Sequence, residues 1–367
     1  MKKHLSVLQI AGILSFLFLS SVCLAVETRE IDSVRAKSVL NSDDLAVIDR
    51  FISDAIKELV TLSDFTIASR QRSIILARQG EQAQYSEQFS RSCREHIGRA
   101  LEQSKAVEPK SAGALIRMNL LILIDSLEDV RLADLVISSL SDESPVVRYW
   151  ALRALTRPEL FAKASPNLKG EVIASLENMV ETATAQELGL IIEFAGASNS
   201  PEADKLLLHI TDTRINSYAK WSVQWYLPDI EILKQLFNKM TTASAANERA
   251  EFGVRFAQLY SYAMQKYIKD IREKFLTPTA KQQLISLLAE IEDKCIGRLT
   301  GLQQTLIRTA IERDDYDSLI MEHGRLFGDQ TQSGLIPDKF GFNYGTDADG
   351  SRRTSPKVLP NAPGMAD

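Results

Sequence analysis

Few side chains in this sequence have the types and spacings that catalysis or metal binding requires. The histidines are His4, His96, His209 and His323, and none lies in HExxH or another dense ligand pattern. Cys93 and His96 are three residues apart on an expected helix, but two ligands do not complete a metal site. GxSxG, P-loop and GxGxxG motifs are also missing. The sequence therefore predicts no catalytic residue, no cofactor and no metal site.

An aromatic group offers a different kind of chemistry, the stacking of a sugar or a peptide. Tyr218, Trp221 and Trp225 are spaced so that they share one face of a helix expected over residues 218–227. The same spacing is typical of the apolar seam along which one helix packs against another. We therefore keep two interpretations of these residues, an exposed partner surface and a buried seam, and the seam is the commoner one.

The cysteines leave a second question open. Cys23 lies within an expected signal peptide, so the mature chain keeps Cys93 and Cys295. In an oxidising compartment these two could form a disulfide that ties an N-terminal helix to a C-terminal one. Two buried free thiols are an equally good interpretation, because pairing cannot be derived from spacing alone.

The first 25 residues indicate the compartment. Lys2 and Lys3 precede an apolar run over residues 5–24, and Cys23 and Ala25 occupy the small-residue positions of a cleavage site. This pattern predicts a secretory signal peptide that is cut before Val26, and the alternative is an uncleaved membrane anchor. We expect the mature protein to be periplasmic or extracellular. No later segment is long and apolar enough to predict a membrane span.

Composition restricts the fold and the partners. Removal of Lys2 and Lys3 takes the 43 basic residues to 41 against 48 acidic ones, so the net charge goes from −5 to −7. Such a chain has no electrostatic reason to bind nucleic acid. Glycine and proline are sparse before residue 328, which favours helices over a many-turned β fold. The sequence predicts an all-α protein.

Helices must position these residues, and the middle of the chain predicts them in pairs. Residues 111–243 contain apolar segments of helical length that are separated by short loops. The segments are 114–127, 130–140, 142–155, 168–180, 187–195, 201–210, 218–227 and 230–240. Their period, roughly thirty to forty-odd residues, is typical of helical repeats.

One of these segments, 142–155 (DESPVVRYWALRAL), resembles the first helix of a HEAT-type repeat. The matching residues are Asp142, Pro145, Val147, Arg148, Ala151, Ala154 and Leu155. The resemblance implies that Asp142 and Arg148 belong to a ladder between neighbouring repeats, and that small residues let the helices pack closely. It also implies an armadillo-type α-solenoid of helix pairs that presents a concave face to another macromolecule.

The ends of the chain predict different structures from the middle. Residues 26–110 indicate a helical hairpin that caps the array, and residues 244–327 indicate a hairpin or bundle of longer helices. Residues 328–367 are rich in glycine, proline, aspartate and serine, so we expect a disordered tail with a docking spot at Phe340, Phe342 and Tyr344.

Together these observations predict an exported, non-catalytic scaffold or adaptor that binds another protein. The alternative function is a glycan-binding or glycan-processing protein whose helical cleft is lined by aromatic residues and carboxylates.

Overall fold

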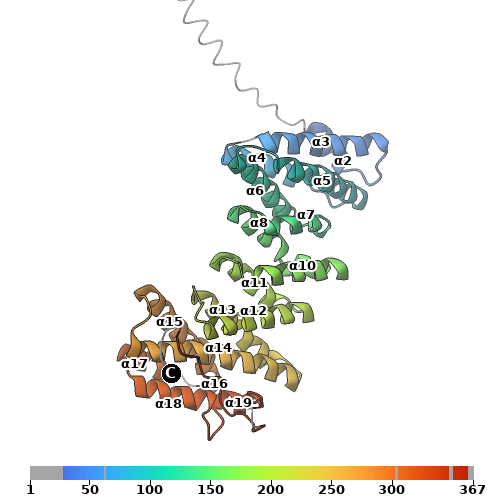
Figure 1. Ribbon diagram of the computed structural model, residues 1–367. Helices are drawn as coiled ribbons and strands as arrows, with labels where there is room; N and C mark the ends of the chain where they lie inside the picture. Colours follow the sequence, from blue (N-terminus) through green and yellow to red (C-terminus); the bar gives the residue numbers. More distant parts are fainter. Residues whose placement is uncertain (1–27, 62, 302–304, 347–349, 363–367) are drawn as a thin grey trace, which may run out of the picture. The chain divides into compact units, whose positions relative to one another are not determined.

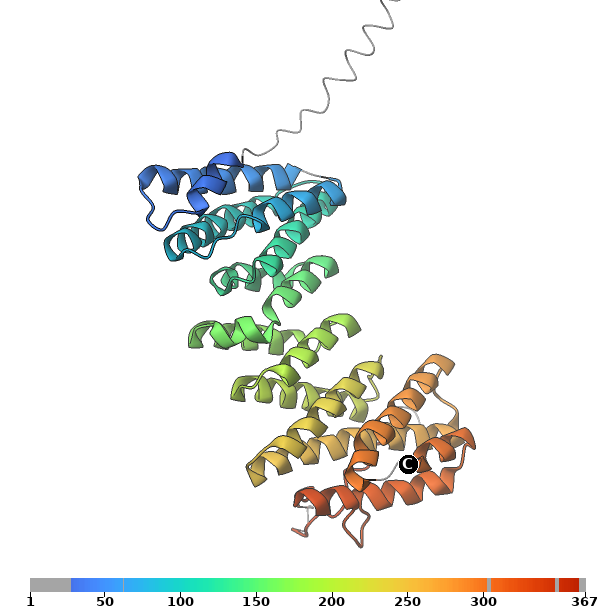
Figure 2. The same ribbon diagram turned by 180° about the vertical axis from the view of Figure 1, so that it is seen from behind.

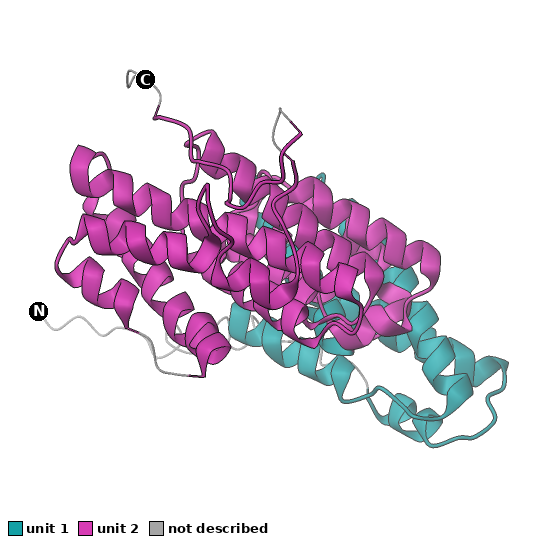
Figure 3. Ribbon diagram, turned by 90° about the horizontal axis from the view of Figure 1, so that it is seen from below, with its two compact units in different colours: residues 1–127 teal, residues 128–367 magenta. Residues whose placement is uncertain are grey.

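The computed structural model describes residues 28–61, 63–301, 305–346 and 350–362, and the expected signal peptide lies outside these ranges. Within them the chain is helical, with two isolated β-bridges and no strand, so the all-α prediction is confirmed. Along the described part of the chain, no helix combines the length and the apolar character needed to cross a membrane. The chain divides into two compact units, Met1–Leu127 and Glu128–Asp367 (Figure 3).

Unit 1 is a cluster of helices around α3. Its helices are α2 (Arg29–Arg35), α3 (Ser42–Thr61), α4 (Phe65–Leu76), α5 (Ala83–Ser104) and α6 (Lys110–Leu127). The central helix α3 packs against all four others. Its apolar stripe of Ile48, Ile52, Ile56 and Leu59 recurs at helical spacing and is buried.

Unit 2 contains the remaining helices. They are η1 (Val130–Leu132), α7 (Asp134–Ile137), η2 (Ser138–Ser141), α8 (Pro145–Leu155), α9 (Pro158–Lys163), α10 (Pro166–Met179), α11 (Ala185–Ala197), α12 (Pro201–Ala219), α13 (Leu227–Thr242), α14 (Ala246–Glu273), α15 (Pro278–Ile291), η3 (Glu292–Ile296), α16 (Gly297–Thr300), α17 (Leu306–Glu312), α18 (Tyr316–Phe327) and α19 (Leu335–Phe340).

Most of unit 2 is a solenoid-like stack of helix pairs in two layers (Figures 1 and 2). In the first layer α8, α11, α13 and α15 pack in sequence, and in the second layer α7, α10, α12 and α14 do the same. Helices α8, α11 and α13 begin at Pro145, Ala185 and Leu227, which are 40 and 42 residues apart. This packing is compatible with helical repeats.

Capping residues allow the short loops between these helices. Ser165, Ser200 and Thr277 each accept a hydrogen bond from a backbone N–H in the first turn of α10, α12 and α15, and a proline follows each of them. Thr184 and Glu187 form a reciprocal capping box at the start of α11. Each helix therefore begins at a residue fixed by the local sequence.

The helix predicted over residues 218–227 is wrong. Helix α12 ends at Ala219, Trp221 adopts a left-handed backbone conformation with φ 57°, and α13 begins at Leu227. Pro228 favours the start of α13 at this point, because a proline has no N–H to donate inside a helix and fits its first turn. The aromatic residues of 218–227 keep a helical spacing, although the backbone between α12 and α13 is not helical.

The expectation of a disordered tail is also wrong for most of residues 328–367. Helix α19 and the segment after it pack on the long helix α14. Phe342 lies so close to Gly253 that a Cβ there would be 2.7 Å from its ring, and the Tyr344 hydroxyl donates to the carbonyl of Phe327 at 3.0 Å. The apolar side chains Ile336, Phe342 and Leu359 of this tail are buried, so a low average hydrophobicity did not predict disorder. Residues 347–349 and 363–367 lie outside the described part.

Candidate functional site

Arg148 joins α8 to α11, which belong to consecutive helix pairs of the stack. Its Nε donates to Oε1 of Glu187 at 2.9 Å, which connects α8 to the first turn of α11. Its Nη1 donates to the main-chain carbonyl of Asp142 at 2.9 Å, while the Asp142 carboxylate accepts from the N–H of Ser144. Arg148 thus links neighbouring pairs through Glu187, a partner that the sequence analysis did not identify.

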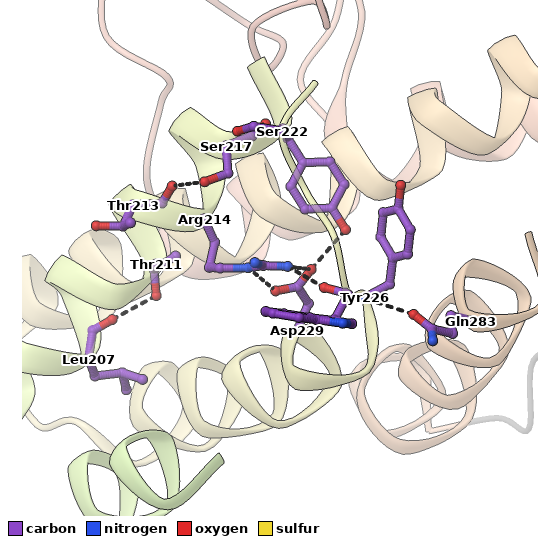
Figure 4. A network of polar contacts seen from close by, with 11 residues as sticks. Leu207, Thr211, Thr213, Arg214, Ser217, Ser222, Tyr226, Asp229 and Gln283 are labelled. Atoms are coloured by element: carbon purple, nitrogen blue, oxygen red, sulfur yellow. Dashed lines mark hydrogen bonds and ion pairs between the residues drawn. The ribbon is translucent and has the colours of Figure 1, made fainter. Parts of the chain in front are cut away.

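Arg214 and Asp229 form a more deeply buried ion pair between α12 and α13 (Figure 4). The guanidinium donates to both carboxylate oxygens, at 2.6 and 3.0 Å, and to the carbonyl of Trp225 at 2.5 Å. The Tyr218 hydroxyl donates to the same carboxylate at 2.9 Å. These bonds close the loop over residues 220–226 against the start of α13.

Lys266 on α14 lies against this ion pair inside an aromatic cage. Its ammonium is 4.8 Å from the ring centroid of Trp221, 5.3 Å from that of Tyr226 and 5.7 Å from that of Tyr218. Burial, reinforced by the Arg214 charge and opposed by Asp229, lowers the pKa of Lys266 to about 8. The sequence analysis did not identify this lysine, because α14 brings it to the cage from outside the aromatic segment.

The buried carboxylate and the low polarity of the cage also affect the nearby hydroxyls. Burial, with a smaller contribution from the Asp229 charge, raises the pKa of Tyr218 well above its usual value. The same two causes raise the pKa of Tyr226 to about 12. Both hydroxyls are therefore neutral at physiological pH, and neither is a nucleophile or a general base there.

The expected aromatic partner surface does not exist as a shared face. Tyr218 is fully buried, and Trp221 packs edge-on against Phe275 with ring centroids 5.0 Å apart. Trp225 is 38% exposed at the rim of a hollow of about 490 Å³. The break after Ala219 places the three side chains in different surroundings, so they form no common stacking surface, and Trp225 is the most exposed of them.

Cys93 and Cys295 are both buried, the first on α5 of unit 1 and the second in η3 of unit 2. Burial raises the pKa of the Cys295 thiol to about 12, so it stays protonated and unreactive at neutral pH.

A serine and a histidine meet on α14 and α18. Ser261 Oγ lies 2.7 Å from His323 Nε2, and Gln265 donates to the same hydroxyl at 2.8 Å. Burial lowers the pKa of His323 to about 4, so the imidazole that shares this hydrogen bond is neutral at physiological pH. Ser261 is fully buried, which makes this pair a packing contact in the structure as it stands. Among the described residues, no cluster of three or more histidine, cysteine or carboxylate side chains could hold a metal ion.

The outer face of α8 carries side chains that are typical of protein interfaces. Val146, Tyr149, Trp150 and Arg153 recur at helical spacing on the side opposite the buried residues of α8, and each is half-buried or exposed. The Tyr149 and Trp150 rings meet edge-on at 5.7 Å, and the Arg153 guanidinium lies 5.2 Å from the Trp150 ring centroid.

A broad hollow of about 750 Å³ continues this face across α11 to α13. It is lined by Tyr149 of α8, by Gly189, Leu190 and Glu193 of α11, and by Glu231 and Gln235 of α13. A Cβ at Gly189 would meet no atom within 4 Å, so the helix surface there is open. We call this hollow, together with the α8 side chains above, the first-layer face.

No protein-family model and no curated protein matches the chain. Solved structures that are similar to it include an engineered protein whose crystal structure was determined by the Northeast Structural Genomics Consortium. That protein is 10% identical, and the comparison covers 90% of this chain and 96% of the other, with a TM-score of 0.20. A likeness at this TM-score supports no inference about function.

Proposed function

We propose that the protein is an exported, non-catalytic adaptor built on HEAT-like helix pairs, and that it binds another protein across the first-layer face. The observation that carries the proposal is the group of Tyr149, Trp150 and Arg153 beside an open hollow. Tyrosine, tryptophan and arginine are the side chains that contribute most to binding at protein interfaces. Here they lie on a rigid helix, so little conformational entropy is lost on binding.

The chemistry of the hollow also suits a protein partner. Glu193 and Glu231 carry negative charge, Gln235 offers a donor and an acceptor, and Leu190 adds an apolar surface. A segment with basic and apolar side chains would complement this lining. The hollow spans α8, α11 and α13, three successive helices of the first layer. It therefore provides the extended surface that repeat proteins use for binding.

The test is photo-cross-linking in the cell envelope with the complete chain, including residues 1–25. A benzophenone amino acid at Tyr149 should yield a cross-linked protein that is absent when the same group replaces Glu171, an exposed residue of α10 in the second layer. Adding Arg153→Ala to the Tyr149 probe should reduce the yield at least threefold. Equal yields at Tyr149 and Glu171 would contradict the proposal.

The glycan alternative rests on Trp225, which lies at the rim of a hollow lined by Thr213, Asn216 and Gln224. Hydroxyl and amide groups beside an exposed indole could bind a sugar. Binding on a glycan array that is lost in Trp225→Ala, and retained in Tyr149→Ala, would favour this function over the adaptor.

A further inference from the structure

Residues 356–361 (PKVLPN) lie along α14 and are held there mainly through their backbone. We call this segment the C-terminal strap. Most of the contacts come from three side chains of α14, Gln258, Gln265 and Lys269, which share one face of the helix. A fourth contact comes from Trp221 in the loop between α12 and α13.

The two glutamines pair with the strap as another strand would. Gln258 accepts from the N–H of Lys357 at 2.9 Å and donates to its carbonyl at 3.3 Å. Gln265 donates to the same carbonyl at 3.2 Å and accepts from the N–H of Leu359 at 2.7 Å. An amide side chain offers one donor group and one acceptor, so it matches a peptide backbone whatever the peptide's side chains are.

The end of the strap is held by its carbonyl groups. Trp221 Nε1 donates to the carbonyl of Pro360 at 3.1 Å, and Lys269 Nζ donates to the same oxygen at 3.4 Å. Lys269 also donates to the Asn361 side chain at 2.8 Å. Trp221 is the residue with the left-handed backbone, so this unusual conformation places its indole N–H on the strap.

Burial along the strap alternates in a way that suits an extended peptide ligand. Pro356 and Leu359 are buried, whereas Lys357, Val358 and Pro360 face solvent. A spacing of three residues between inward side chains is typical of the polyproline II conformation, which leaves the backbone groups free to be recognised. Leu359 is 1% exposed and Val358 is 78% exposed. The site can therefore discriminate between peptide side chains at the buried positions 356 and 359.

Helix α14 does not depend on the strap for its own packing. It contacts α12, α13, α15, α18 and α19, and its core residues Phe256, Leu259 and Tyr260 are fully buried against them. The strap instead covers the polar glutamine face. Its removal would expose groups that water can solvate, at little cost to the core.

We propose that this face of α14 is a peptide-binding site, and that the strap is an internal occupant that an extended Pro-x-x-Leu segment of another protein displaces. The strap then acts as an autoinhibitory segment, because a tethered ligand competes at an effective concentration in the millimolar range for short flexible linkers. The site is distinct from the first-layer face, so the failure of one proposal leaves the other standing.

The decisive experiment measures binding of a fluorescent peptide with the sequence of residues 354–362 (TSPKVLPNA) to the full chain. Leu359→Asp places a charge in the buried position and should release the strap, so this variant should bind the peptide at least tenfold more tightly than the unaltered chain. Val358→Asp adds the same charge at the neighbouring exposed position and should bind like the unaltered chain. Equal affinity in all three proteins, with unchanged melting temperatures, would overturn the proposal.

Two further measurements locate the site. Adding Gln258→Ala and Gln265→Ala to the Leu359→Asp chain should weaken peptide binding at least tenfold, and undiminished binding would place the peptide elsewhere and overturn the assignment. In the unaltered chain, saturating peptide should speed hydrogen exchange at the Lys357 and Leu359 amides at least tenfold. This measurement uses the unaltered chain, so it does not depend on whether a variant folds. Unchanged hydrogen exchange at saturating peptide would also refute displacement of the strap.

Discussion

Two arginines perform related tasks at successive places in the stack. Arg148 and Arg214 each bind an acidic side chain at the third position of a first-layer helix, Glu187 in α11 and Asp229 in α13. Arg148 comes from α8 of the preceding pair, so its bond ties one pair to the next. Arg214 comes from α12 of the same pair, so its bond closes the pair on itself.

The environments of the two acids differ as well. The Arg214 side chain is 10% exposed and Asp229 is fully buried, whereas the Arg148 side chain is 22% exposed. Glu187 is also buried but keeps its capping hydrogen bond from Thr184 when the arginine is removed. The Asp229 charge is compensated by Arg214 and, more weakly, by the nearby Lys266, and its carboxylate also accepts the hydrogen bond of the neutral Tyr218. The Arg214–Asp229 ion pair within the α12–α13 pair should therefore stabilise the fold more than the Arg148–Glu187 ion pair between α8 and α11. We call the first ion pair the clamp and the second the inter-pair link.

The largest effect is expected for Arg214→Ala. It leaves the Asp229 carboxylate buried without its cation, which should lower the free energy of unfolding by about 3–5 kcal/mol. Chemical denaturation monitored by circular dichroism measures this loss. In the double variant Arg214→Leu with Asp229→Leu, neither charge of this pair is left buried without its partner, so most of the stability should return. A single variant as stable as the unaltered chain would show that the ion pair is not a clamp.

A smaller effect is expected for Arg148→Ala. Glu187 keeps the N–H of Thr184, and Arg148 is partly solvated, so the loss should be about 1–2 kcal/mol. Thermal unfolding measures it, with Arg153→Ala, an exposed residue of the same helix, as the control for losing an arginine from α8. If Arg148→Ala destabilised the protein as much as Arg214→Ala, the expected difference in strength between the two ion pairs would be contradicted.

The pH dependence of stability should reveal the lowered pKa of Lys266, which lies against the Arg214–Asp229 ion pair. Its pKa in the folded protein is about 8, below the usual 10.5, so between these values the unfolded chain binds more protons at this residue. The free energy of unfolding therefore rises with pH in that window, by at most about 1.4 kcal/mol per pH unit from this group. Lys266→Met should remove the rise. The tyrosines of the cage, whose raised pKa values give the opposite slope above pH 10, are present in both proteins.

The sequence predicted what local chemistry determines and missed what distant segments bring together. Pro145, Arg148 and the capped helix starts follow from short patterns, so the paired helices could be placed from the sequence. Glu187, Asp229 and Lys266 reach their partners only when the helices stack. The break at Trp221 was hidden because Tyr218, Trp221 and Trp225 keep a helical period although the backbone leaves the helix after Ala219. The tail was misjudged because composition does not reveal that α14 offers glutamines to its backbone.

The smallest expected effect tests whether the link between pairs is one coupled network. Thr184→Ala removes the cap of α11 and should cost about 1 kcal/mol. Because Glu187 binds both Thr184 and Arg148, the double variant with Arg148→Ala should depart from additivity by about 0.5 kcal/mol or more. Ser200→Ala removes the cap of α12, which shares no bond with Arg148, so its combination with Arg148→Ala should be additive. Additive losses in both pairs would mean that the cap and the inter-pair link act separately, and that Glu187 does not transmit between them.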